Sequence, residues 1–129
     1  MTVELNHTII PARDKWTSAK FLADILNLEA GPEWGHFVPV CTGNGVTLDY
    51  SDSLDFRPQH YAFLVSEAEF DAALSRIRAA GVAHYANFRR ELPGEINHLY
   101  GGRGVYFDDP SGHLLELIIR PYGPIPQGA

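Results

Sequence analysis

The same order of predicted elements occurs twice along the 129-residue chain. In each half, a strand-like segment is followed by a helix and then by two or three further strand-like segments, separated by turns rich in Gly and Pro. The strand-like segments are residues 3–10, 35–40 and 45–51 in the first half, and 59–65, 82–87, 102–107 and 113–120 in the second. This order predicts an α+β fold of two modules, about 1–56 and about 57–122. Each helix should cover one face of its sheet and leave the other face to curve around a pocket between the modules.

Local signals mark where the two helices begin. Pro11 is expected to end the first strand, and Asp14 or Ser18 to cap the helix that follows it. In the second half, Ser66 and Glu69 have the spacing of a capping box, in which each residue bonds to the backbone of the other. Both helices carry apolar residues at helical spacing, which is typical of helices that pack on a sheet.

Composition excludes several classes of protein. Ten Lys and Arg against sixteen Asp and Glu give a net charge of −6, so we expect no nucleic-acid partner. No apolar run is long enough to span a bilayer and the N-terminus does not resemble a signal peptide, so we expect a cytoplasmic protein without a membrane partner. Cys41 is the only cysteine, which excludes an internal disulfide, and its apolar flanks favour a packed side chain.

Side-chain alternation selects three residues that could meet in the pocket. In residues 113–120, Glu116 is a lone carboxylate among apolar residues and faces away from the predicted helix side. His60 faces the same way in residues 59–65, and His7 occupies the matching position in the first module. Two histidines and one carboxylate could therefore converge on the concave face.

Such a trio is suited to metal chemistry. Two neutral imidazoles and one carboxylate can hold a divalent ion and leave coordination positions for substrate, water or dioxygen. The alternative is that each residue is an ordinary strand residue, and the matched positions in the two modules favour ligands instead. We expect Fe²⁺, Mn²⁺, Zn²⁺ or Ni²⁺ as the ion and a small molecule with two neighbouring oxygens as the substrate.

Three stretches resemble the vicinal oxygen chelate superfamily, which includes glyoxalase I, fosfomycin-modifying thiol transferases, extradiol dioxygenases and bleomycin-binding proteins. They are "LNHTII", "QHYAFLV" and "YFDDPSGHLLEL", and the resemblance covers nearly the whole chain as a single domain, 1–129. It implies paired βαβββ modules forming a curved mixed sheet, with His7, His60 and Glu116 as the metal ligands. In many members the site is completed across a dimer, so a homodimer is expected.

The reaction within the superfamily has several candidates. The segment "INHLYGGRGVYFDDPSGHLLE" is similar to the C-terminal signature of extradiol dioxygenases, which implies proton transfer or substrate contact by His98 and a hydrogen bond from Tyr106 to a substrate oxygen. A glyoxalase-like reaction would need a fourth ligand from the first module, and Asp49 lies near the matching position, where it would bind the metal directly or lie beside the ligands. A fosfomycin-type thiol transferase is less well matched, because Ile9 stands where those enzymes commonly carry threonine.

Two arginines are candidates for holding an anionic substrate. Arg120 is expected to share a face with Glu116, and Arg103 lies in the Gly-rich loop 87–104, which we expect to cover the site as a mobile segment.

A function of a different class is sequestration of a drug or another small molecule, as in bleomycin-type binding proteins. Aromatic residues that could line such a groove are Trp34, Phe37, Phe56, Tyr85, Phe88 and Tyr100. A pure binding protein has no need of the complete ligand trio, so the sequence favours a metal-dependent enzyme, dioxygenase-like or glyoxalase-like.

Overall fold

The computed structural model describes residues 2–123 and divides them into two compact units. The first unit runs up to Arg57 and includes the short segment Asp109–Ser111. The second runs from Pro58 to Asp108 and continues from Gly112.

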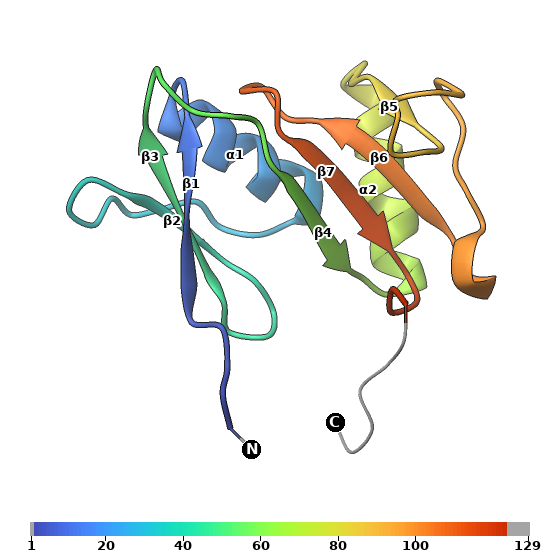
Figure 1. Cartoon of the computed structure of the whole chain (residues 1–129), viewed down its shortest axis with the longest axis horizontal. Helices are drawn as coiled ribbons and strands as arrows, with labels where there is room; N and C mark the ends of the chain where they lie inside the picture. The colour runs from blue at the N-terminus through green and yellow to red at the C-terminus, as the bar shows by residue number, and fades with distance from the viewer. Residues whose placement is uncertain (1, 124–129) are drawn as a thin grey trace. The chain divides into compact units, whose positions relative to one another are not determined.

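The first unit is a three-stranded sheet with one helix. The strand order is β1-β3-β2, with β1 parallel and β2 antiparallel to the central strand β3. The helix α1 lies on one face of this sheet (Figure 1), where its side chains Ala19, Leu22 and Ile25 are buried. The elements are β1 (His7–Ala12), α1 (Lys15–Leu26), β2 (Val38–Cys41) and β3 (Thr47–Asp52).

The segment that joins β1 to α1 corrects one expectation and confirms another. Pro11 does not end the first strand, because β1 continues to Ala12. An edge strand tolerates proline, since the missing N–H can fall on the open side of the strand. Asp14 caps α1 by accepting a hydrogen bond from the Thr17 backbone N–H. The other candidate cap, Ser18, is buried within the helix and bonds to Ser111 Oγ at 3.0 Å.

The second unit is a four-stranded sheet in the order β4-β7-β6-β5, with β4 parallel to β7 and the other pairs antiparallel. The helix α2 lies behind this sheet (Figure 1), and the capping box of Ser66 and Glu69 is present at its start. The predicted strand at 82–87 is reduced to two residues. The elements are β4 (His60–Leu64), α2 (Glu67–Ala79), β5 (His84–Tyr85), η1 (Leu99–Gly101), β6 (Gly104–Asp108) and β7 (Leu114–Ile118).

The predicted α+β class with two mixed sheets is confirmed. The second unit has one helix and four strands, whereas the first has three strands and an isolated bridge between Ala30 and Val40. Cys41 is exposed at the end of β2, so the expectation of a packed side chain is wrong. Among residues 2–123, no helix has the length and apolar character needed to cross a membrane.

Candidate functional site

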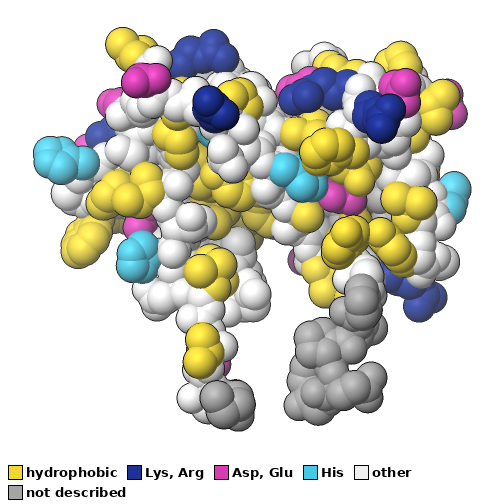
Figure 2. Space-filling view, viewed as in Figure 1, with side chains coloured by type: hydrophobic (Ala, Val, Ile, Leu, Met, Phe, Trp, Pro, Cys, Tyr) yellow, Lys and Arg dark blue, Asp and Glu magenta, His cyan; other side chains and the backbone are white. Residues whose placement is uncertain are grey.

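The face of the second sheet that α2 leaves uncovered carries the candidate site. Along β4, His60, Ala62 and Leu64 are exposed, whereas Tyr61 and Phe63 are half-buried, as the alternation predicts. On the face shown in Figure 2, a histidine lies beside an acidic side chain in this unit, with hydrophobic side chains around them.

His60 and Glu116 form the centre of this group. The parallel register pairs His60 with Leu114 and Ala62 with Glu116, so the histidine on β4 and the glutamate on β7 share one face. The His60 Nε2 lies 3.0 Å from Glu116 Oε1, and the His60 Nδ1 lies 2.9 Å from the Leu114 carbonyl oxygen. Glu116 is only 6% exposed.

These two distances determine the chemistry of the imidazole. A carbonyl oxygen can only accept a hydrogen bond, so Nδ1 is protonated and its N–H donates a hydrogen bond to the Leu114 carbonyl oxygen. In a neutral ring the lone pair is then on Nε2 and faces the Glu116 carboxylate. Two acceptors 3.0 Å apart repel each other unless a cation lies between them, either a proton on Nε2 or a metal ion.

The donor set fits a divalent ion. His60 would offer an imidazole nitrogen and Glu116 a carboxylate oxygen, and both atom types are ligands that divalent ions accept in proteins. The bond from Nδ1 to a backbone carbonyl is also the usual support of a metal-binding histidine. Within residues 2–123, however, no three His, Cys, Asp or Glu side chains are grouped to hold one ion.

Tyr106 packs against both members of this pair. It is the register partner of Glu116 across β6 and β7, and its ring stacks on the His60 ring with centroids 5.9 Å apart and planes 24° apart. Burial raises the pKa of the Tyr106 hydroxyl well above its ordinary value, and the charge of Glu116 and a hydrogen bond to it add to this rise. The phenol therefore stays protonated and donates to the Glu116 carboxylate.

His7 and Asp49 repeat this register in the first unit. His7 on β1 pairs with Thr47, and Asp49 lies two residues further along β3. His60 and Glu116 have the same relation on the parallel pair β4 and β7. His7 is exposed and its Nδ1 lies 2.8 Å from Asn6 Oδ1, while Asp49 is buried. The two units thus place a histidine and an acid at equivalent positions.

The structure does not join the remaining predicted residues to the group of His60, Glu116 and Tyr106. His98 is exposed immediately before η1, and among the described residues its ring makes no hydrogen bond to any of the three. Because β7 ends at Ile118, the strand alternation does not extend to Arg120, whose Nε donates to the Gly101 carbonyl at 3.1 Å.

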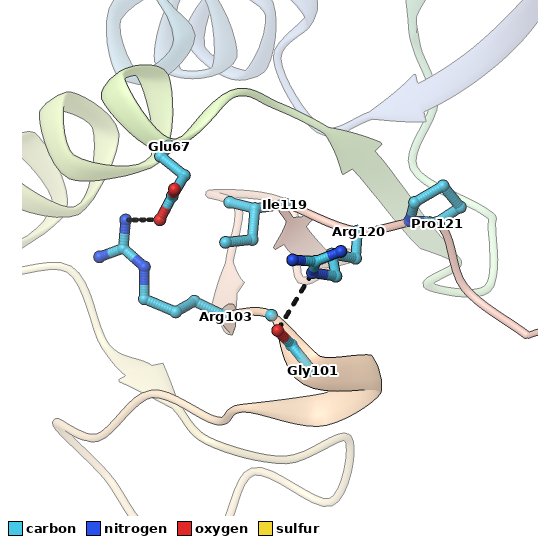
Figure 3. Close-up of a pocket in the computed structure, with 7 residues that line it drawn as sticks. Glu67, Gly101, Arg103, Ile119, Arg120 and Pro121 are labelled. Atoms are coloured by element: carbon cyan, nitrogen blue, oxygen red, sulfur yellow. Dashed lines mark hydrogen bonds and ion pairs between the residues drawn. The ribbon is translucent and has the colours of Figure 1, made fainter.

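Arg103 and Arg120 line a separate open pocket of about 300 Å³, together with Glu67, Gly101, Gly102, Ile119 and Pro121 (Figure 3). Arg103 is already paired there, since its guanidinium lies 2.7 Å from Asp71 and 3.5 Å from Glu67. It also lies 4.6 Å above the centre of the Phe70 ring.

Phe88 contacts this group and His113 holds the residue next to it, and the sequence assigned neither of them to the metal site. His113 is fully buried, and its Nδ1 accepts a hydrogen bond from the Gln59 backbone N–H at 2.8 Å, which holds the residue before His60. Phe88 meets the His60 ring edge-on, with centroids 5.2 Å apart. The sequence named Phe88 only as one of six aromatic residues that could line a binding groove, because its loop position follows no periodic pattern that would place it beside His60.

Each of the two units is built of strands and one α-helix, with a histidine and an acid at equivalent positions on a parallel strand pair. Residues 4–117 match the Glyoxalase/Bleomycin resistance protein/Dioxygenase superfamily, and the chain belongs to this superfamily. The resemblance found in the sequence is therefore confirmed.

Individual relatives include enzymes of two kinds. The structure of "Oxidase ChaP-H2" is 60% identical, with a TM-score of 0.92 over 95% of this chain and 98% of that one. "Oxidase ChaP-H1" is 52% identical, with a TM-score of 0.91 over 95% of this chain and all of that one. "Glutathione transferase FosA" of Serratia marcescens is 30% identical over 126 residues, which cover 92% of this chain and 82% of that protein.

Proposed function

We propose that the chain is a divalent-metal-dependent oxidase that acts on a small substrate with two neighbouring oxygens. The observation that carries this proposal is the pair of His60 Nε2 and Glu116 Oε1, 3.0 Å apart on the sheet face that α2 leaves uncovered. The 60% identity to an oxidase over nearly the whole of both chains supports oxidation as the reaction.

His60, Glu116 and His7 are the proposed ligands. A bound ion would supply Lewis-acid polarisation of the substrate oxygens and, in the case of Fe²⁺, electrons for dioxygen. The chain's own groups do the rest. The Leu114 carbonyl orients the imidazole of His60, and Tyr106 holds the Glu116 carboxylate and keeps a proton close to the substrate. His98, Arg103, Arg120 and Asp49 stay candidates for proton transfer or substrate contact.

His7 is proposed to come from a second copy of the chain. His7 is exposed to solvent on the edge strand β1. Its apolar neighbours Leu5 and Ile9 are 68% and 53% exposed. A second copy would cover these side chains and bring a third ligand to His60 and Glu116. A homodimer is therefore part of the proposal.

The metal content of the purified protein, produced without a histidine tag, tests the proposal. Mass spectrometry of the wild type is expected to find about one ion per proposed site, and His60→Ala and Glu116→Gln are expected to lose nearly all of it. The matched control is His36→Ala, which removes an exposed histidine of the first unit and should leave the metal content unchanged. Anaerobically iron-loaded wild type should then consume dioxygen with one of a panel of catechols and related hydroxyaromatic compounds.

Thiol transfer is the second candidate, because FosA is a glutathione transferase. Consumption of glutathione in the presence of an epoxide, without uptake of dioxygen, would favour it over oxidation. Absence of metal from the wild type, even after reconstitution, would contradict both and favour sequestration of a small molecule.

A further inference from the structure

Phe88 is a large apolar residue that does not pack in the core and lies beside the candidate site. Its side chain is 58% exposed, although its ring contacts two members of the candidate site. The ring meets His60 at 5.2 Å with planes 88° apart, and Tyr106 at 6.3 Å with planes 85° apart. An apolar ring left largely in water beside polar side chains is typical of a surface that a ligand covers.

The backbone on either side of Phe88 is held by its own turn. The Asn87 side-chain oxygen accepts hydrogen bonds from the backbone N–H groups of Arg89 and Glu91, both at 3.0 Å. The Asn87 amide nitrogen also donates to Glu91 Oε1 at 3.0 Å. These bonds close the turn around Phe88 and do not depend on its ring, which stays more than half exposed.

Asp108, at the end of β6, anchors the same turn to the sheet. Its two carboxylate oxygens accept from Arg90 Nε at 2.8 Å and from the Tyr85 hydroxyl at 3.0 Å. Arg90 has a φ of 59°, a backbone conformation that residues other than glycine adopt rarely and only where the surroundings impose it. These contacts hold the turn, and with it Phe88, beside His60.

We propose that Phe88 is the specificity-determining residue of the site and selects substrates that carry a flat apolar group next to their two chelating oxygens. This inference rests on the proposed metal site at His60 and Glu116. A substrate that chelates the ion there would extend over the exposed part of the Phe88 ring, where a flat group gains a stacking contact. Asp108 is a positioning residue, since it holds the turn on which Phe88 lies.

Two hydroxamic acids test this inference, because they share one oxygen-chelating group and differ in the part that Phe88 would contact. Benzohydroxamic acid carries a phenyl ring, whereas acetohydroxamic acid carries a methyl group. Their Kd values would be measured by titration calorimetry on the Zn²⁺-loaded wild type, Phe88→Ala, Asp108→Asn and Arg89→Ala. Arg89→Ala is the matched control, because it changes an exposed side chain of the same turn and keeps the backbone N–H that bonds to Asn87.

For Phe88→Ala we expect a Kd of benzohydroxamic acid raised about three- to tenfold, and a change of less than about twofold for acetohydroxamic acid. Asp108→Asn should shift the ratio of the two Kd values in the same direction at unchanged zinc content, and Arg89→Ala should leave the ratio unchanged. Equal changes for both acids, or no change for either, would overturn the role of Phe88. If neither acid binds to the zinc-loaded wild type, the proposed metal site itself is wrong and the inference fails with it.

Discussion

Tyr106 is buried, and its hydroxyl lies beside the carboxylate of Glu116. Because burial and the charge of Glu116 both disfavour the phenolate, the folded-state pKa is raised above the ordinary value of 10.0. Below about pH 10 the hydroxyl is protonated in the folded and unfolded states, and its contribution to stability is complete. As the pH rises from there through the folded-state pKa, the unfolded chain loses this proton first and the contribution is lost.

Tyr106→Phe should therefore reduce the fall in the free energy of unfolding that occurs as the pH is raised above about 10. The free energy of unfolding, measured by urea titration in the presence of a chelator at about pH 8 and about pH 11, should fall less for the variant than for the wild type. Tyr122→Phe is the control, because Tyr122 is 72% exposed and its charge is the smallest of the contributions to the raised pKa of Tyr106, so this variant should stay close to the wild type. An equal fall for all three proteins would contradict the protonated, buried state of Tyr106.

Among the elements, α2 shows how one local motif supports the sheet that carries the site. The Ser66 hydroxyl accepts from the Glu69 backbone N–H at 3.1 Å, and the Glu69 carboxylate accepts from the Ser66 backbone N–H at 2.8 Å. The second bond lowers the pKa of Glu69. The helix that begins here buries Phe70, Ala73, Leu74 and Ile77 on one side.

Ser66→Ala should lower the free energy of unfolding by about 1 kcal/mol, because it leaves an N–H of the first helical turn without its acceptor. Chemical denaturation of the metal-free protein measures this change. Ser75→Ala, in the exposed middle of the same helix, should alter the free energy of unfolding by less than about 0.5 kcal/mol. Equal effects of the two substitutions would show that the capping box does not stabilise the helix.

The sequence predicted the features of these elements that depend on neighbouring residues, and missed those that depend on residues far apart in the chain. The capping box and the alternation along β4 are local patterns. The cap at Ser66 and the position of His60 on the same sheet face as Glu116 were therefore predicted correctly. The end of β1 was predicted wrongly, because Pro11 is acceptable only through its position at the edge of a sheet, and that position depends on the pairing with β3. Phe88 was predicted only as one of several groove-lining aromatic residues, and its contact with His60 was not, because its place depends on Arg90 and Asp108, which are 18 residues apart.

At the scale of the whole molecule, the proposed homodimer combines two groups in equivalent registers, His7 with Asp49 and His60 with Glu116. The first unit supplies a histidine without a bonded acid, and the second supplies a bonded histidine and acid. Two copies of the chain would then carry two equal sites, each with residues of both chains.

Subunit complementation tests this arrangement. His7→Ala and His60→Ala should each abolish metal binding alone, whereas a refolded mixture should contain heterodimers with one complete site. Metal content in the mixture should therefore recover in part, to about half the wild-type value in the heterodimer fraction. A ligand set supplied by one chain would give no recovery on mixing. The control is a mixture of His60→Ala with Glu116→Gln, which lack ligands of the same unit and should not recover.

The short turn Asp109–Ser111 has a consequence for the order in which the chain can fold. It belongs to the first unit, where Ser111 Oγ accepts from the Arg13 backbone N–H at 3.0 Å and bonds to Ser18. A ribosome produces β1, α1, β2 and β3 well before Ser111, so the first unit leaves the exit tunnel without these bonds. The half of the chain that is made first is therefore completed only after the strand that carries Tyr106 has been synthesised.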